Sequence, residues 1–182
     1  MKLSIFLSLS LLLDHPTPAS SWQQLGSTIT SGEAFFSSFG SAVDISEDGR
    51  RVAVGSPHHD DGNGAVFLYE LDDETDNSWS LVTSVPGASG EGLGDFFSLS
   101  PDGHMLSVRR HHGTPNVNVV QVYSVNLNIA DQIGPNIVET CELEGESVTL
   151  GQAASKYYLL VGCESYDDDR GKVQAFELED NK

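Results

Sequence analysis

The sequence repeats itself with a period close to 54 residues. Residues 46–54 (SEDGRRVAV) recur as residues 100–108 (SPDGHMLSV), and residues 66–69 (VFLY) recur at the same offset as residues 120–123 (VQVY). A third, weaker copy contains residues 159–162 (LLVG). A period of this length, built from short apolar runs, is typical of β-propeller blades or of a β-solenoid.

Each copy contains about four short strand-like runs, and no long stretch beyond the N-terminus carries a helical stripe. Val43 and Ile45 alternate with polar neighbours, which predicts a half-buried strand. Residues 65–69 are apolar on both faces, which is typical of a strand between two packed layers. The predicted fold class is therefore all-β. The strands predicted for the first copy cover 22–29, 40–46, 51–55 and 64–71.

Asp-Gly pairs mark the turns of the first two copies. Asp48-Gly49 and Asp102-Gly103 each separate two apolar runs. Glycine accepts a positive φ and aspartate tolerates it, so both pairs predict tight hairpin turns. The third copy has residues 151–156 (GQAASK) at this place, which predicts a longer and less regular loop.

The flanks of the repeat return as well. Residues 132–137 (QIGPNI) match the latter part of residues 22–29 (WQQLGSTI) at twice the period. In the second copy the corresponding place contains Trp79 and Val82, and the match is weaker. The alternative is that Ser-x-Asp-Gly is only a frequent turn. Several features in the same order at the same spacing favour a true repeat. A Gly-Glu pair follows the flank in each copy, at 32–33, 90–91 and 145–146.

The N-terminus has the pattern of a secretory signal peptide. Lys2 precedes an apolar run over residues 3–13, and small residues near Ala19 offer a cleavage site. The run is too short for the roughly 20 residues of a spanning helix. The alternative is a buried core helix. We therefore expect a signal peptide over 1–19 and a secreted chain over 20–182, with repeats at approximately 22–78, 79–131 and 132–182.

The chain is strongly acidic. The formal net charge is −18, from 27 acidic and 9 basic residues. This balance argues against nucleic-acid partners and anionic membrane surfaces. It favours cationic partners, metal ions, or simply solubility. No second apolar run is long enough to cross a bilayer, so membrane insertion is not expected.

Two cysteines, Cys141 and Cys163, are expected to form one disulfide bond. An even cysteine count in a secreted chain favours pairing. Two separate buried thiols are the alternative. No Asn-x-Ser/Thr sequon is present, so N-glycosylation is not expected.

Residues in the first copy carry a resemblance to a known family. Phe39-Gly40 followed by Gly55-Ser56-Pro57 resembles the FG-GAP repeat of integrin alpha-subunit β-propellers. The resemblance weakens in the second copy and is poor in the third. It implies a β-propeller whose family roles are ligand binding and adhesion, usually without catalysis.

Three such units are fewer than the 4–8 blades that close a propeller. The expected architecture is therefore a partial β-propeller of about three four-stranded antiparallel blades, which is open or is completed by oligomerisation or by further blades. An open array leaves strand edges and an apolar blade face uncovered. A truncated gene product is the other interpretation.

Some blades of integrin type bind calcium in an Asp-rich loop, and Asp44, Ser46 and Asp48 match the first part of that pattern. Alternating oxygen side chains around a Gly turn suit calcium, which takes six to eight oxygen ligands. Val52 stands where the pattern has its last aspartate. The alternative is a hydrogen-bonded Asp-Gly turn without metal.

Three loops at corresponding places in the copies are expected to lie on one side of the array and to form a contact surface for protein or glycan ligands. The first two carry histidine pairs that could also meet a transition metal. The alternative is a set of solvated polar loops. The residues are His58, His59, Asp60 and Asp61 in the first copy, His111 and His112 in the second, and Asp167, Asp168 and Asp169 in the third.

No catalytic motif is present: the sequence contains no Gly-x-Ser-x-Gly elbow, His-Glu-x-x-His helix or phosphate loop. We therefore expect a secreted or cell-surface binding module rather than an enzyme. Two alternatives remain open. One is a propeller enzyme acting on extracellular polysaccharide, and the other is a structural or remnant fragment of a longer repeat protein.

Overall fold

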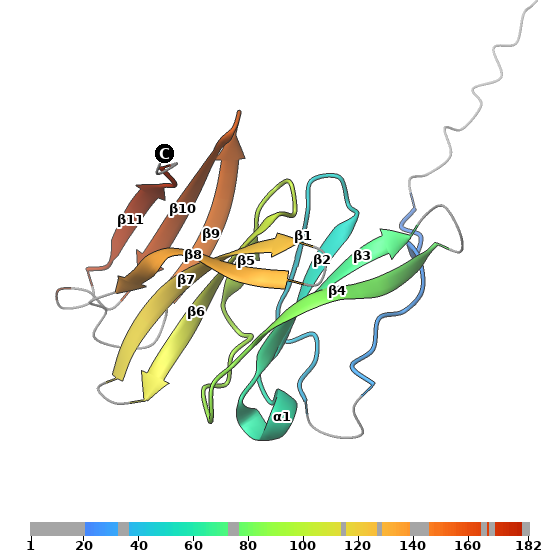
Figure 1. Cartoon of the computed structure of the whole chain (residues 1–182), viewed down its shortest axis with the longest axis horizontal. Coiled ribbons are helices and arrows are strands. Elements are labelled where there is room, and N and C mark those ends of the chain that lie inside the picture. Colours follow the sequence, from blue (N-terminus) through green and yellow to red (C-terminus); the bar gives the residue numbers. More distant parts are fainter. Residues whose placement is uncertain are drawn as a thin grey trace, which may run out of the picture.

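The chain folds into three antiparallel β-sheets that stand side by side in sequence order (Figure 1). This computed structural model describes residues 21–32, 37–72, 77–113, 116–126, 129–138, 146–164, 167 and 170–179, and the side chains of 112, 113, 116, 117, 138 and 146 are not among the described parts. The predicted signal peptide over 1–19 lies outside the described residues. The all-β fold class is confirmed.

Every sheet is a meander in which each strand pairs with its neighbours in sequence. Sheet 1 contains β1 (Val43–Ile45), β2 (Arg51–Ser56), β3 (Ala65–Asp72) and β4 (Ser78–Pro86). Sheet 2 contains β5 (Phe97–Leu99), β6 (Met105–Gly113), β7 (Asn116–Asn126) and β8 (Ile129–Val138). Sheet 3 contains β9 (Glu146–Ala153), β10 (Lys156–Cys163) and β11 (Lys172–Glu177).

Two apolar cores lie between consecutive sheets. The first lies between sheets 1 and 2, where Leu68 of β3 and Leu106 of β6 are each 1 % exposed. The second lies between sheets 2 and 3 and includes Val120 and Val161. The first strands of the three sheets are neighbours, because β5 contacts both β1 and β9. Sheet 2 is therefore covered on both faces, and sheets 1 and 3 each use one face in a core.

The Asp-Gly turns are confirmed. Gly49 and Gly103 both have a φ of +73°, the left-handed conformation that a side chain disfavours. The longer loop predicted for the third copy is wrong. Ala153 pairs with Lys156, so β9 and β10 are joined by a two-residue turn, and Ala154 takes the positive φ of 56° that glycine usually provides.

The predicted burial of β1 is also wrong. Val43 and Ile45 are 68 % and 55 % exposed, whereas Asp44 between them points toward sheet 2. The alternation correctly predicted that β1 is a strand. Its apolar side chains, however, lie on the face that none of the three described sheets covers. The side toward sheet 2 takes Asp44 because its carboxylate accepts hydrogen bonds there from the Leu99 N–H and the Ser98 hydroxyl.

The strand predicted at 22–29 is not formed. These residues are irregular and lie against the start of β4, where the Trp79 indole N–H donates to the Leu25 carbonyl at 3.1 Å. The helical turn α1 (His59–Gly62) includes Asp60 and Asp61 at positive φ and is a tight loop rather than a helix. No helix among the described residues has the length and hydropathy needed to span a membrane.

The sheets are displaced by one strand from the predicted repeats. β4 and β8 open the second and third sequence units but form the last strands of sheets 1 and 2. Sheet 3, as described, has three strands, and β11 is its edge.

Candidate functional site

Two connections, β2–β3 and β4–β5, are bound to each other by backbone hydrogen bonds at one end of the sheets. The Gly92 N–H donates to the Gly62 carbonyl at 3.0 Å, and the Leu93 N–H donates to the Asn63 carbonyl at 3.1 Å. Gly64 and Leu93 form a parallel bridge. A Cβ at Gly64 would lie 2.2 Å from the Leu93 nitrogen, so only glycine allows this approach.

A polar cleft of about 380 Å³ opens between these connections and the ends of β6 and β7. His58 from the first predicted loop and His111 from the second both line it. The expectation that the two loops share one side of the array is met for these two residues. The other polar side chains of the cleft are Glu91, Asp95, Arg109 and Asn118.

Neighbouring groups hold the cleft side chains in place. His58 Nδ1 lies 2.8 Å from the Ser38 hydroxyl, and His111 Nδ1 lies 3.0 Å from Asn118 Oδ1. The Arg109 guanidinium stacks over the Phe96 ring, 3.9 Å from its centroid. These contacts leave the cleft with imidazole, amide, guanidinium and carboxylate groups of restricted orientation.

Glu91 forms a buried ion pair with Arg110. Its Oε2 accepts a hydrogen bond from Arg110 Nη1 at 2.7 Å, and the two side chains are 3 % and 12 % exposed. The same Oε2 accepts the Ala88 N–H at 2.6 Å. Arg110 also donates to the Pro86 carbonyl and the Tyr123 hydroxyl. Glu91 Oε1 and Arg110 Nε are both buried without a hydrogen-bond partner, so the second hydrogen bond of a two-point contact is not formed in this pair.

The remaining residues of the first two predicted loops do not line this cleft. His59 packs edge-on against Phe67, with ring centroids 5.0 Å apart. Asp60 accepts a hydrogen bond from the Asn63 amide at 2.8 Å, and Asp61 is exposed. The side chain of His112 lies outside the described parts.

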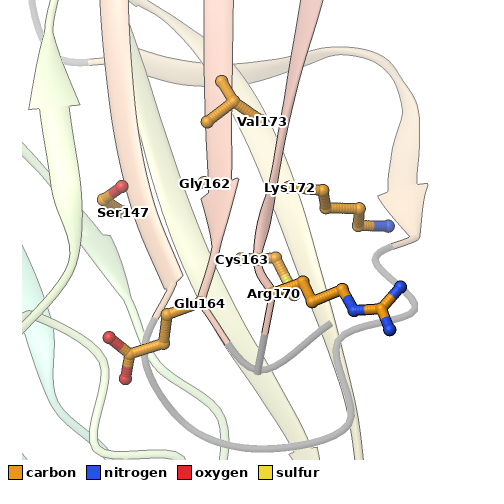
Figure 2. A pocket seen from close by; sticks show the side chains of 8 residues that line it. Ser147, Gly162, Cys163, Glu164, Arg170, Lys172 and Val173 are labelled. Carbon is orange, nitrogen blue, oxygen red and sulfur yellow. The ribbon is translucent and has the colours of Figure 1, made fainter. Parts of the chain in front are cut away.

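The third predicted loop is only partly described. Asp167 forms an exposed ion pair with Arg170 at 3.2 Å, and Asp168 and Asp169 lie outside the described residues. A second cleft of about 610 Å³ opens beside this loop. Figure 2 shows Arg170 and Lys172 on one side of it and Ser147 and Glu164 on the other.

The candidate calcium residues take part in local hydrogen bonds. Asp44 accepts from the Ile45 N–H as well as from sheet 2. Asp48 accepts from the Ser46 hydroxyl at 2.7 Å and from the Arg50 N–H at 3.0 Å, and these bonds lower its pKa, the Ser46 bond most. Among the described residues, no three His, Cys, Asp or Glu side chains are grouped so that they could hold a metal ion. Calcium binding stays a prediction.

Asp102, the second-copy equivalent of Asp48, connects sheet 2 to sheet 3. It accepts the Tyr157 hydroxyl and the Gln152 amide in addition to the Ser100 hydroxyl. Burial is the largest single influence and raises its pKa, but the hydrogen bonds outweigh it and the pKa is lowered. Burial and the Asp102 carboxylate raise the pKa of Tyr157 to about 12.

Cys163 is 3 % exposed at the end of β10 and has no free thiol. Its expected partner, Cys141, lies outside the described residues, so the pairing stays a prediction.

Sequence reasoning placed His58 and His111 on one surface but missed four polar partners in the cleft: Glu91, Asp95, Arg109 and Asn118. One signal pointed to Glu91, because it belongs to the Gly-Glu pair that recurs in each copy. The others come together through contacts between connections that the repeat pattern does not describe.

No protein-family model matches this chain, and a comparison with curated proteins finds no match either.

Proposed function

We propose that the protein is a secreted, non-enzymatic binding module whose sheets are blades of an FG-GAP-like β-propeller. Its ligand would bind in the cleft that contains His58 and His111. The observation that carries the binding proposal is the set of polar side chains, among them His58, Asp95 and His111, that line one cleft of about 380 Å³. Their nitrogen and oxygen atoms can form hydrogen bonds with a ligand that carries hydroxyl groups.

Two features support the propeller interpretation. The sheets are meanders packed in sequence order, with their first strands as neighbours. The two halves of the FG-GAP-like pattern also meet, because the Gly40 N–H donates to the Gly55 carbonyl at 2.8 Å and the Ser56 hydroxyl donates to the Ser37 carbonyl at 2.8 Å.

The chemistry of the cleft favours a glycan over a protein loop. Planar amide, imidazole, guanidinium and carboxylate groups can donate to and accept from sugar hydroxyls. Protein–protein hot spots are usually aromatic or arginine anchors in apolar pockets. The described lining of this cleft contains no Trp, Tyr or Phe, and its arginine, Arg109, is already stacked on Phe96.

Binding of the secreted chain to an array of extracellular glycans, followed by titration calorimetry on the best ligand, tests the proposal. Asp95→Asn and His111→Ala should each weaken binding by about tenfold, as expected for one lost hydrogen bond to a buried ligand group. Asp61→Asn, an exposed loop carboxylate outside the cleft, is the matched control and should leave affinity unchanged. An array without binders, or equal affinity for all four proteins, would contradict the proposal.

The alternative of a polysaccharide-acting enzyme would need histidines and carboxylates that converge on one substrate. His59 and Asp60, the residues that it would use from the first loop, are engaged with Phe67 and Asn63. Release of new reducing ends from a glycan that the protein binds would favour the enzyme over the binding module.

A further inference from the structure

Sheet 3 has an open place for a fourth strand. In sheets 1 and 2 the third strand is followed by a paired fourth strand, in which Trp79 lies opposite Leu71 and Ala130 lies opposite Val125. Leu178 is the third-sheet equivalent of Leu71 and Val125. The Leu71 N–H donates to the Arg50 carbonyl, the Val125 N–H to the His104 carbonyl and the Leu178 N–H to the Tyr157 carbonyl, which are corresponding positions of the three sheets. Beyond β11, the described residues contain no strand.

An apolar cavity of about 280 Å³ lies at this place. Its sheet 3 side is formed by Tyr157, Phe176 and Leu178, and its sheet 2 side includes Ile133 and Pro135 of β8. The corresponding place between sheets 1 and 2 is filled, because Ala130 of the fourth strand packs against the first core. The cavity marks the place that a side chain of a fourth strand would occupy.

Residues 22–29 have the local conformation of a fourth strand. Gln24 Nε2 donates to the Gly26 carbonyl at 3.2 Å, and Gln132 of β8 makes the same bond to Gly134 at 3.2 Å. Gly26 and Gly134 have φ angles of +70° and +71°. Residues 22–29 therefore share with β8 the local irregularity at a glycine of positive φ, although no strand among the described residues pairs with them.

The repeat offset determines the register in which residues 22–29 would pair with β11. Because Gln24 corresponds to Gln132, Trp22 corresponds to Ala130 and would lie opposite Leu178. Its indole would then face sheet 2 and enter the apolar cavity. Trp22 is 103 % exposed in the structure, and Trp79 holds the same position in sheet 1.

Residues 22–29 do not reach this place within the same chain. Residues 22–29 lie against Trp79 of sheet 1, whereas β11 is on the far side of sheet 2 (Figure 1). The open face of sheet 1 carries Val43, Ile45 and Leu81, which are 68 %, 55 % and 55 % exposed. Val43 and Ile45 correspond to Phe97 and Leu99 of sheet 2, which pack in the core that sheet 1 covers. Sheet 1 therefore has an exposed apolar face whose counterpart in sheet 2 packs against a neighbouring sheet.

We propose that residues 22–29 of one chain add as the fourth strand to β11 of a second copy, and that two copies exchange this strand around a twofold axis. Sheet 3 of each copy then stacks on sheet 1 of the other. Six four-stranded sheets close into one ring, within the range of propeller sizes. The contact does not depend on the ligand cleft, which lies between sheets 1 and 2 of a single chain.

Light scattering of the mature chain over a range of concentrations tests the exchange. The expected result is a single species of twice the chain mass. Deletion of residues 20–30 should give a monomer, and Trp22→Ala should raise the dimer dissociation constant at least tenfold. Thr30→Ala, an exposed change outside the matched segment, is the control and should leave the dimer intact. A monomeric wild type, an open polymer that grows with concentration, or a dimer that survives the deletion would overturn the proposal.

A cross-link tests the register without depending on how a variant folds. Trp22→Cys together with Leu178→Cys should give a disulfide-linked dimer on a non-reducing gel, with the two new cysteines in one cross-linked peptide by mass spectrometry. Leu25→Cys with Leu178→Cys is the matched control, because Leu25 would lie on the opposite face of the added strand. Cross-linking of the control pair as readily as the first, or of neither pair, would overturn the inferred register.

Discussion

The hydroxyl of Tyr157 in β10 donates a hydrogen bond to the carboxylate of Asp102, which lies in the turn between β5 and β6. The turn of sheet 2 is thereby fixed to sheet 3. The equivalent aspartate of the first copy, Asp48, forms its side-chain hydrogen bonds within its own turn. At that interface Arg51 has the connecting role, since it donates to the Gly103 carbonyl at 3.1 Å and pairs with Glu70.

Asp102→Ala should destabilise the protein more than Asp48→Ala. Both changes remove the hydrogen bonds to a serine hydroxyl and a backbone N–H, but only the first also leaves Tyr157 and Gln152 without their acceptor. We expect an additional loss of about 1–3 kcal/mol in the free energy of unfolding, measured by urea denaturation. Equal losses for the two variants would show that the contact between sheets contributes nothing.

The contribution of Asp102 should depend on pH. Its folded pKa is below the ordinary value of 3.8, so its stabilising effect is present above that value and is lost as the pH falls through the folded pKa. The difference in unfolding free energy between the wild type and Asp102→Ala should therefore shrink in acid below about pH 4. A difference that is constant from neutral pH into this range would contradict the assignment.

Tyr157 should ionise only at strongly alkaline pH. Its pKa is raised from 10.0 to about 12, so the stability that it contributes is full below pH 10 and is lost as the pH rises toward 12. Ultraviolet absorbance should show one late phenol, absent in Tyr157→Phe. In Asp102→Ala the late phase should move toward pH 10, because the carboxylate no longer opposes the tyrosinate charge.

The buried pair of Glu91 and Arg110 should show strong coupling. Removal of one partner, in Glu91→Gln or Arg110→Met, leaves the other charge buried and should cost about 3–5 kcal/mol. The double variant should lose less than the sum of the two single changes. Unfolding curves for the four proteins give the coupling energy, and strictly additive losses would contradict a specific pair.

Gly55→Ala should destabilise the packing of β2 against the β4–β5 connection. A Cβ at Gly55 would lie 1.8 Å from the Gly94 carbonyl oxygen, so the backbone would have to move. We expect a loss of about 1–3 kcal/mol. Gly151→Ala, where nothing lies within 4 Å of the added Cβ, is the matched control and should change stability little.

The local parts of the fold could be predicted from the sequence. The turns at Gly49 and Gly103 depend on residues next to each other in the chain. An Asp-Gly pair supplies the glycine that the positive φ of such a turn favours. The tight turn of the third copy was not predicted, because Ala154 takes a positive φ that an alanine in the sequence does not indicate. Residues 22–29 were predicted as a strand from their match to 132–137, but pairing requires a neighbouring strand, and pattern alone does not supply one.

The composition of the cleft could be predicted only in part. The repeat offset places His58 and His111 at corresponding ends of neighbouring sheets. Asp95 joins them because backbone hydrogen bonds between Gly62 and Gly92 bring two connections together, and no periodicity encodes that approach. The same limit applies to Val43, since alternation identifies an apolar face without saying what covers it.

Because every hydrogen-bonded strand pair joins neighbours along the chain, the protein can fold in the order in which a ribosome makes it. Both sides of the first core are complete once β8 has left the ribosome, before sheet 3 has emerged. Pairing of this local kind has a low loop-closure cost and is fast compared with distant β pairing. The nascent chain would then carry a finished two-sheet unit ahead of β9, and ribosome-bound chains that are just long enough for β8 to have left the exit tunnel should already resist protease across sheets 1 and 2.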